Sequence, residues 1–375
     1  MSVQRTISLL AATRHIGWGG VGKLQLILEK LPFADIVLHG DEPTVAMTKQ
    51  FLGPQHSFAA GLPSKIDAAL VVNDPAAADI AADRGIPVVY VDSLPYMRTG
   101  NDVPKFGGVH YCAQKYPADL FPITNPLLQS WQDIKWIDPI VPTPQARRGG
   151  GGIVISVGGL YVRNLSGMAS DLMNESVDSY LALVVIPLID LLQRSNKKIS
   201  AICGNINDEW CRRIGALMPE GVAVGPQSSR AFAQLLTEAD LLITSPGSTT
   251  ILQALSIDLP TLLLPPQNRS QLVNADIFSK RDAPIMRWPE SVLDLEQLRQ
   301  MRENGLSAEN NYIYASIVAA SRSADQSGRV ADVIHDGVVG DHGEGVLDSA
   351  LHSLGIAGAE QVARLVEEVA RATPL

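Results

Sequence analysis

The run Ser245-Pro-Gly-Ser-Thr-Thr250 carries the clearest chemical signal, because it separates an apolar stretch from a helical pattern. Gly247 lets a ligand approach the backbone, while Ser248, Thr249 and Thr250 place hydroxyl and N–H groups at a helix start, where the helix dipole favours an anion. Gln253 lies one turn further on the same face and can reach the group attached to that anion. The alternative is that the Ser and Thr residues only cap a buried helix.

Other glycines of the second half of the chain also follow strand-like apolar runs. Gly158 and Gly159 follow residues 153–157, and Gly225 follows residues 222–224. Each charge-assisted hydrogen bond to phosphate contributes about 1.5–3 kcal/mol, so a few backbone N–H groups suffice to hold a diphosphate. His, Cys and Asp residues do not occur at metal-ligand spacing. We therefore expect diphosphate binding without a metal.

Candidate proton acceptors follow strand-like runs of the first half. His15 comes just after the first run, and Asp92 closes the run 88–91 and precedes Ser93; either could take a proton from an acceptor hydroxyl or amine. Asp74 is a third candidate, although Pro75 beside it also suits a helix cap. Each of them has a plain alternative as a loop or capping residue.

The run GWGGVGKL over residues 17–24 matches the G-x-x-x-x-G-K pattern of a phosphate-binding P-loop and sits between a strand and a helix pattern. Leu24 replaces the Ser or Thr that would hold Mg²⁺, so a P-loop kinase or ATPase is a minority interpretation. The glycines could instead only allow close packing of strand and helix.

The composition favours a globular enzyme that acts on small molecules. The 375 residues are 46% hydrophobic and 18% charged, with a net charge of -9 and no strong Lys/Arg cluster, which disfavours nucleic acid as a partner. Three widely spaced cysteines fit a reducing cytosol. The sequence predicts no signal peptide and no membrane span, so we expect a cytoplasmic protein. A homodimer is compatible with the sequence, which does not determine the oligomeric state.

Strand and helix patterns alternate along the chain and predict an α/β fold with two doubly wound, Rossmann-like domains facing across a cleft. A segment rich in Pro and Gly before residue 152 is the best boundary. We expect a first domain over residues 1–145 that binds an acceptor, a second over 151–340 that binds a nucleotide sugar, and a C-terminal segment over 341–375 whose helix packs on a domain surface. Residues 17–22 are predicted to form a glycine-rich loop before a helix over 24–31, residues 177–194 a long helix, and residues 336–345 a loop.

The second half resembles the nucleotide-binding domain of GT-B glycosyltransferases, and most nearly the bacterial enzyme that adds N-acetylglucosamine to lipid-linked muramyl-pentapeptide. The resemblance rests on about thirty-five residues in order: Ala239-Asp240, Ser245-x-Gly247, Thr249-Thr250, Gln253-Ala254, Pro260, Pro265-Pro266 and Gln271-x-x-Asn274-Ala275. The resemblance implies an enzyme that transfers the sugar of a nucleoside diphosphate sugar with inversion. This donor is a substrate, and no further cofactor is implied. By this resemblance Thr249 and Thr250 hold the diphosphate, Gln253 the ribose and Gln271 the sugar.

Two departures from that pattern bear on the donor. The ribose position is usually Glu, where this chain has Gln253, and the acidic residue that often precedes the sugar-contacting Gln is Ser270, with Arg269 beside it. An Arg next to the sugar suits a carboxylate, which points to UDP-glucuronate.

The start of the chain also looks like cytosylglucuronate synthases of nucleoside-antibiotic pathways, which join cytosine to glucuronate. Trp18 could stack on a planar acceptor, although an aromatic residue in a loop is more often a packing anchor. From their places at strand ends, the acceptor-binding candidates are Gly17, Trp18, Gly19, Gly20, Asp74 and Ser93.

Three rival functions stay open at this point. Nonhydrolysing UDP-N-acetylglucosamine 2-epimerases share the two-domain build, but they predict acidic residues around Gly247, which Ser245-Pro246 does not supply. A P-loop phosphotransferase would need Mg²⁺ and Lys23. A non-catalytic binding protein on a degenerate transferase fold is hinted at only by Gln253.

Overall fold

The computed structural model describes residues 6–14, 19–40, 45–46, 48–49, 52, 57–58, 65–98, 103–105, 107–116, 133–160, 170–279, 284–340 and 354–372. The chain forms two compact units. The first comprises the described residues within Met1–His15, Gly19–Thr143 and Ala350–Leu375, and the second those within Pro144–Ser349. The chain therefore returns to its first unit at the C-terminus.

The first unit is built on a parallel sheet of seven strands in the order β3-β2-β1-β4-β5-β6-β7. Its strands are β1 (Ile7–Thr13), β2 (Ala34–His39), β3 (Ser57–Phe58), β4 (Ala68–Val72), β5 (Val88–Asp92), β6 (Val109–Gln114) and β7 (Lys135–Ile137). Its helices are α1 (Gly19–Leu28), α3 (Pro75–Asp83), the 3-10 turn η1 (Pro95–Met97) and α14 (Gly358–Ala372).

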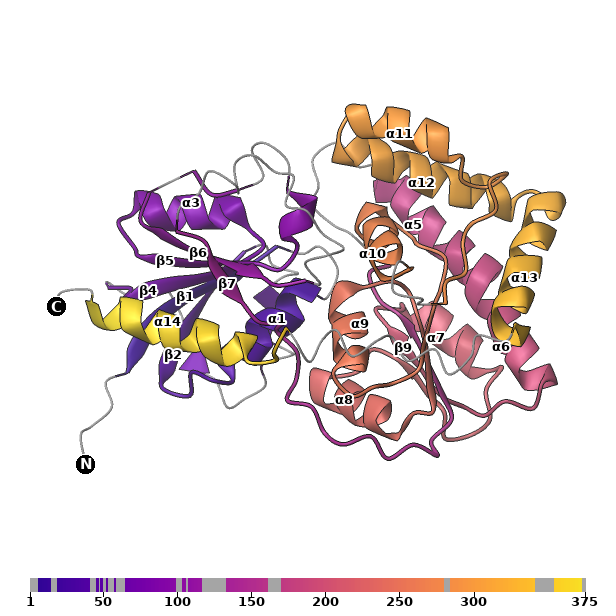
Figure 1. The fold of residues 1–375 in the computed structure, drawn as a ribbon, viewed down its shortest axis with the longest axis horizontal. Helices are drawn as coiled ribbons and strands as arrows, with labels where there is room; N and C mark the ends of the chain where they lie inside the picture. Colours follow the sequence, from indigo (N-terminus) through magenta and orange to yellow (C-terminus); the bar gives the residue numbers. More distant parts are fainter. Residues whose placement is uncertain are drawn as a thin grey trace. The chain divides into compact units, whose positions relative to one another are not determined.

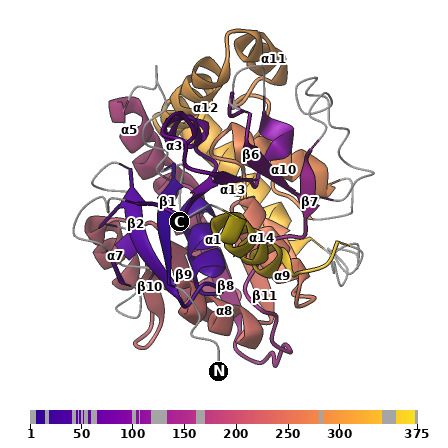
Figure 2. The same ribbon diagram turned by 90° about the vertical axis from the view of Figure 1, so that its left-hand side faces the viewer.

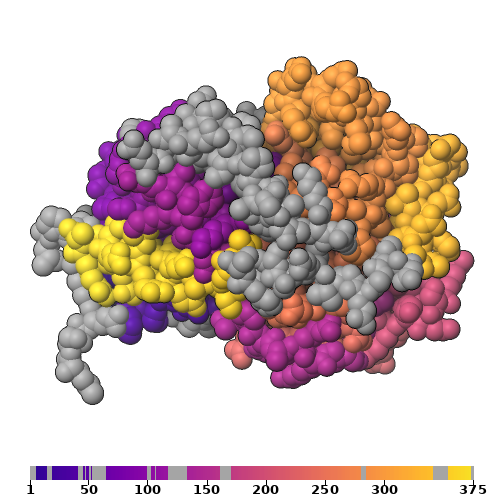
Figure 3. Space-filling model, in the orientation of Figure 1, coloured from indigo at the N-terminus to yellow at the C-terminus, as the bar shows by residue number. Residues whose placement is uncertain are grey.

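Helices cover both faces of this sheet, so β4 and β5 are buried throughout. Helices α1 and α14 pack on one face in a core that includes Leu24, Leu70 and Val366, while the alanines of α3 pack on the other. Figures 1 and 2 show α14, in yellow, lying along the sheet beside α1. In the space-filling view its outer side forms part of the surface of the unit (Figure 3).

The second unit has a parallel sheet of five strands in the order β10-β9-β8-β11-β12. The strands are β8 (Ile153–Val157), β9 (Ile199–Gly204), β10 (Ala223–Gly225), β11 (Leu241–Thr244) and β12 (Thr261–Leu263). The helices are α5 (Ser170–Tyr180), the π-helical turn η3 (Leu181–Val185), α6 (Ile186–Arg194), α7 (Asp208–Gly215), α8 (Ser229–Glu238), α9 (Ser248–Leu255), α10 (Arg269–Ser279), α11 (Leu295–Glu303), α12 (Leu306–Ser321) and α13 (Ala324–Val339).

The larger core of this unit lies between one face of the sheet and the helices α5, α6, α7, α12 and α13. The smaller core, with Val154 and Leu242, lies under α8 and α9 on the other face. Both sheets follow the doubly wound pattern, in which the strand order reverses beside the first strand.

Three local predictions need correction. The glycine loop predicted up to Gly22 is helical from Gly19, and a Cβ atom on Gly20 would lie 2.5 Å from Thr13 Oγ1, so this glycine allows close packing of α1 on β1. The loop predicted from Asp336 is instead the last turn of α13, as far as Val339. The predicted helix over 177–194 starts at Ser170 and contains the π-helical turn, in which Ile186 N–H bonds to Leu181 O.

Candidate functional site

The carboxyl edge of the second sheet brings the predicted donor-binding residues together. Strands β8 and β11 are neighbours, with Ser156 opposite Thr244, and the strand order reverses between them. Ligands of doubly wound sheets bind at such a point, beyond the carboxyl ends of the strands. Gly158 and Gly159 follow β8 here, and the Ser245–Thr250 turn follows β11.

The start of α9 is shaped to receive a ligand. Gly247 is its N-cap residue, with φ -80°, and it provides no side-chain hydrogen bond to the helix. A Cβ atom at this position would meet only Ser245 O, at 3.9 Å. Neither the backbone conformation nor packing in the described part of the chain therefore requires glycine here. Within the described residues, Gly247 therefore leaves open space beside the N-terminus of α9, the end of a helix that attracts anions.

At the other predicted glycines, different physical reasons explain why the residue is glycine. Gly225 has φ +113°, and a Cβ atom would lie 2.9 Å from Cys211 Sγ, so conformation and packing explain this residue. Gly159 has φ +76° and leaves room for Gln271 Nε2, which a Cβ atom would approach to 2.9 Å. At Gly158 such an atom would meet nothing within 4 Å in the described part of the chain. Gln253 is buried on α9, and its contact with a ribose stays a prediction.

Two side-chain amides at the start of α10 have orientations set by backbone groups. Gln271 Oε1 accepts from Gln267 N at 2.8 Å, and Gln271 Nε2 donates to Gly158 O at 3.0 Å. Asn268 Oδ1 accepts from Gln271 N at 3.1 Å and from Ser270 Oγ at 2.7 Å, while Asn268 Nδ2 donates to Gly159 O at 3.4 Å. Because backbone N–H groups only donate and carbonyls only accept, each amide has a single possible orientation. Each amide nitrogen has a second hydrogen with which to donate.

Arg269 packs against helix α12. Its Nε lies 3.1 Å from Oε2 of the fully buried Glu309, and its backbone N–H donates to Asn310 Oδ1 at 3.0 Å. Arg302 contacts the same carboxylate, with Nη2 3.0 Å from Glu309 Oε1. The predicted contact between Arg269 and the sugar stays a prediction. The Glu309 carboxylate thus has two guanidinium partners.

At the carboxyl edge of the first sheet, the predicted base Asp92 is the centre of a buried network. Arg98 Nε and Nη2 donate to its two oxygens at 2.9 and 2.8 Å, Leu94 N donates at 2.9 Å, and the Tyr111 hydroxyl donates to Oδ2. Burial is the largest single effect on the pKa of Arg98 and lowers it, but the charge and hydrogen bond of Asp92 together with Tyr90 and Tyr111 outweigh burial and raise that pKa above its usual value. Burial and the Asp92 charge raise the pKa of Tyr111, so its phenol stays protonated.

This geometry favours a structural role for Asp92 rather than the predicted role of base, because both oxygens are engaged and the residue is fully buried. Its neighbour Ser93 is also tied down: Ser93 N donates to Asn73 Oδ1 at 2.9 Å, and Ser93 Oγ accepts from Asn73 Nδ2 at 2.8 Å. Asp74 caps α3 by accepting from Ala77 N at 3.1 Å. Asp74 thus has the role of a helix cap, which was its alternative interpretation.

The predicted site residues of the first strand end are only partly described. His15, Gly17 and Trp18 lie outside the described residues. Gly19 and Gly20 belong to α1, and Lys23 on the same helix is only 1% exposed. A helical Gly19–Gly22 segment with a buried lysine does not form the phosphate-cradling loop that the P-loop interpretation needs.

Sequence reasoning missed Asn73, Arg98, Gln267 and Asn268. Gln267 and Asn268 directly follow Pro265-Pro266, at the end of a buried strand. Their position could have indicated a role in the site, because polar residues just after a buried strand lie at the edge of the sheet where ligands bind. Arg98 carried no such signal, because only the folded η1 turn brings it back to Asp92.

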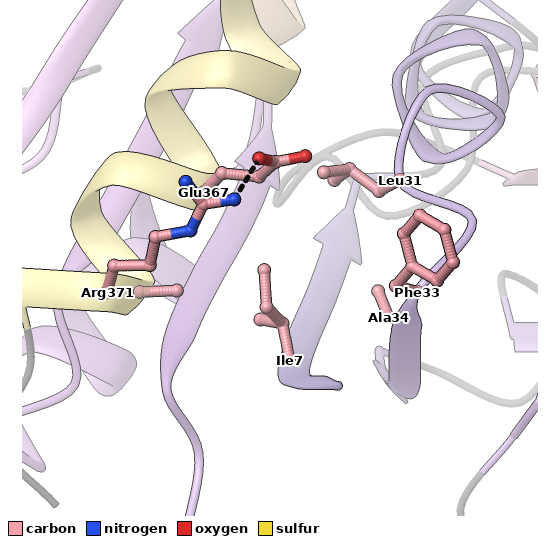
Figure 4. Close-up of a pocket in the computed structure, with 7 residues that line it drawn as sticks. Ile7, Leu31, Phe33, Ala34, Glu367 and Arg371 are labelled. Atoms are coloured by element: carbon pink, nitrogen blue, oxygen red, sulfur yellow. Dashed lines mark hydrogen bonds and ion pairs between the residues drawn. The ribbon is translucent and has the colours of Figure 1, made fainter. Parts of the chain in front are cut away.

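Two hollows lie at the opposite, amino edges of the sheets. One is lined by Ile7, Phe33 and Arg371 among others, near the beginnings of β1 and β2, where Glu367 and Arg371 form an ion pair (Figure 4). The second is lined by Lys198, Ile199 and Glu238 among others. We assign no ligand to either, because in parallel sheets ligands bind at the carboxyl edge.

In the described ranges, no three His, Cys, Asp or Glu side chains are grouped so that they could hold a metal ion. None of the described helices has the length and apolar character needed to cross a membrane.

A family model described as "CGA synthase-related protein" matches residues 54–281, which is more than half of the chain. The chain belongs to the CGA synthase-related family. The comparison with curated proteins gives no match.

Solved structures similar to this CGA synthase-related chain include UGT89C1 of Arabidopsis thaliana complexed with UDP, with 10% identity, a TM-score of 0.53 and coverage of 97% of this chain and 100% of that one. The spinosyn rhamnosyltransferase SpnG complexed with thymidine diphosphate is 12% identical, with a TM-score of 0.50 and the same coverage. MurG of Acinetobacter baumannii is 13% identical over 96% of this chain and 99% of its own, with a TM-score of 0.47. The likeness to UGT89C1 and to SpnG confirms the predicted GT-B fold.

Proposed function

We propose that this protein is a glycosyltransferase that moves glucuronate from UDP-glucuronate to a small planar acceptor such as cytosine, with inversion and without a metal. The observation that carries this proposal is the open start of α9, where Gly247 leaves room for a ligand at the switch point of the second sheet. A diphosphate placed there would meet helix N–H groups and the hydroxyls of Ser248, Thr249 and Thr250.

In the proposed reaction an acceptor nitrogen or hydroxyl attacks C1 of the sugar, and the bond between C1 and the diphosphate oxygen breaks. The acceptor's proton passes to a base, for which His15 remains the candidate, since Asp92 is held by Arg98 and Tyr111. The charge that develops on the leaving diphosphate is stabilised by the α9 dipole and hydroxyls, so the protein supplies what a metal supplies elsewhere.

A donor sugar with a carboxylate is supported by the groups at the start of α10. The oriented amides of Asn268 and Gln271 each have one further N–H to donate, which suits an acceptor group on the sugar. Arg269, which lies between these two residues in the sequence, adds a guanidinium group at the start of α10. A carboxylate satisfies both features better than the C6 hydroxymethyl group of glucose.

The cytosine acceptor is supported by the family description, whose abbreviation CGA agrees with cytosylglucuronic acid. An isomerase of the 2-epimerase type gains no support, because no acidic side chain lies between Ser245 and Thr250.

The test is a calorimetric titration of the wild type, Gly247→Ala and Gly247→Asp with UDP, UDP-glucose and UDP-glucuronate. We expect the wild type to bind UDP-glucuronate about tenfold more tightly than UDP-glucose, as one added charge-assisted hydrogen bond implies. Gly247→Asp should abolish binding of all three ligands, because a carboxylate would occupy the phosphate site. Gly247→Ala should weaken binding while its melting temperature stays at the wild-type value, since the added methyl has space in the free protein.

Two controls complete this test. Incubation of the wild type with UDP-glucuronate and cytosine, with and without EDTA, should give the coupled product at the same rate, as detected by mass spectrometry. Unchanged UDP affinity in Gly247→Asp would rule out the diphosphate site, whereas equal affinity for the two sugars would rule out only the uronate donor.

A further inference from the structure

The segment between β12 and α10 is held by two buried aromatic donors. The Tyr180 hydroxyl donates to Pro265 O at 2.9 Å, and Trp288 Nε1 donates to Pro266 O at 2.6 Å. Proline has no N–H, so its carbonyl is the only backbone group through which such a residue can be fixed by a hydrogen bond. Two successive proline carbonyls thus each have a dedicated side-chain donor.

The two donors support each other. The rings of Tyr180 and Trp288 pack edge to face, with centroids 6.0 Å apart and an interplanar angle of 73°. Tyr180 is 1% exposed, and it lies at the end of α5, directly before the π-helical turn Leu181–Val185. Turns of this kind are frequent at functional sites.

Tyr180 also contacts side chains of the candidate donor site. Its hydroxyl is within hydrogen-bond reach of Ser245 and Gln267, which lower its pKa, but burial is the larger effect and raises that pKa overall. The phenol therefore stays protonated and keeps the hydrogen that it donates to Pro265 O. Gln267 Nε2 in turn donates to Ser245 Oγ at 2.6 Å.

From Gln267 the contacts continue to the predicted sugar-binding residue. Gln267 N–H donates to Gln271 Oε1, and Gln271 Nε2 donates to Gly158 O. One connected set of hydrogen bonds therefore joins the ends of β8, β11 and β12 and reaches Gln271. The start of α9, where the diphosphate is proposed to bind, adjoins this set through the backbone bond from Gly247 N–H to Ser245 O at 2.6 Å, but the hydrogen bonds of Tyr180 and Trp288 in the described ranges go to the Pro265–Gln267 side of the set.

We propose that Tyr180 and Trp288 are positioning residues that fix Pro265, Pro266 and Gln267 and thereby place the Gln271 amide for the sugar of the nucleotide donor. This inference rests on the proposed function, because it takes Gln271 as the sugar contact. Its particular consequence is selectivity: loss of either donor disturbs recognition of the sugar and leaves recognition of the nucleotide intact.

Tyr180→Phe tests the proposal, because it removes one hydroxyl and keeps the ring. Tyr314→Phe on α12 is a matched control: Tyr314 is a tyrosine of the same unit, 3% exposed, whose hydroxyl has no hydrogen-bond partner in the described part of the chain. Calorimetry with UDP and with UDP-glucuronate gives the dissociation constants, and a thermal melt gives the stability. Trp288→Phe is the second variant, since it removes the indole N–H and keeps an aromatic ring.

For Tyr180→Phe we expect the Kd of UDP-glucuronate to rise about three- to tenfold, as loss of one hydrogen bond implies, while the Kd of UDP changes less than twofold. Trp288→Phe should give the same pattern, and Tyr314→Phe should leave both constants unchanged. Equal weakening of both ligands would mean a merely structural role and overturn the proposal, as would unchanged binding of UDP-glucuronate. If the wild type binds neither ligand, the proposed function fails and this inference fails with it.

Discussion

Lys23 is a cation enclosed by the first unit, 1% exposed on α1. Burial lowers its pKa from 10.5 to about 7. The unfolded chain therefore binds more protons than the folded one between about pH 7 and 10.5, so folding stability rises with pH across this window. Below pH 7 the folded protein must keep a buried ammonium group, and the cost of burying it is present in full.

Lys23→Met should remove this cost. We expect the variant to melt at a higher temperature than the wild type at pH 6, with a difference that shrinks as the pH rises from 7 to 9. Lys105→Met, at an exposed position of the same unit, should not change the melting profile. Thermal melts at fixed ionic strength across pH 6–9 measure both. A difference independent of pH would contradict the depressed pKa, and loss of a Mg²⁺-dependent transferase activity would revive the P-loop interpretation.

Two of the three glycines of helix α1, Gly20 and Gly22, have different surroundings, which separates packing from backbone flexibility. A Cβ atom on Gly20 would lie 2.5 Å from Thr13 Oγ1, whereas on Gly22 it would meet nothing within 4 Å. Gly20→Ala should destabilise the first unit by about 1–3 kcal/mol through overpacking. Gly22→Ala should be neutral or stabilising by up to about 1 kcal/mol, because alanine is the better helix former. Chemical denaturation measures both, and equal effects would mean that Gly20 does not serve close packing.

The elements that could be predicted from sequence are those with one dominant signal. Strands β5 and β8 have the predicted ends, because short apolar runs are bounded there by Pro87 and by glycines. The start of α1 was placed too late because a run of glycines predicts a loop, and only packing on β1 makes it helical. The π-helical turn has no periodicity signal in the sequence. Pro187, which follows it, predicts only a kink or a break in the helix.

The same reasoning applies to the candidate site. The turn at Gly247 was predictable, because glycine and hydroxyl residues between a strand and a helix act locally. The partners of Asp92 and Arg269 were not, because Tyr111 and Glu309 lie 19 and 40 positions away and meet them only in the folded chain. Long-range side-chain pairing of this kind has no local pattern.

At the scale of the whole molecule, the chain forms two units with separate cores, and α14 closes the first of them. Its Val366 is fully buried in the core that contains Leu24 and Leu70. The proposed UDP site belongs entirely to the second unit. Proteins of this kind need not unfold in a single two-state transition, and a ligand stabilises only the unit that binds it.

A substitution in α14 and addition of UDP should therefore act on different calorimetric transitions. Val366→Asp buries an unpaired carboxylate at a cost of about 3 kcal/mol or more, which for a unit of this size lowers its transition by about 10 °C. Glu368→Asp, at an exposed position of the same helix, should leave that transition in place. Saturating UDP should raise the other transition in the wild type and in both variants. If Val366→Asp lowered the transition that UDP raises, the C-terminal helix would stabilise the nucleotide-binding unit, and the division of the chain described above would be wrong.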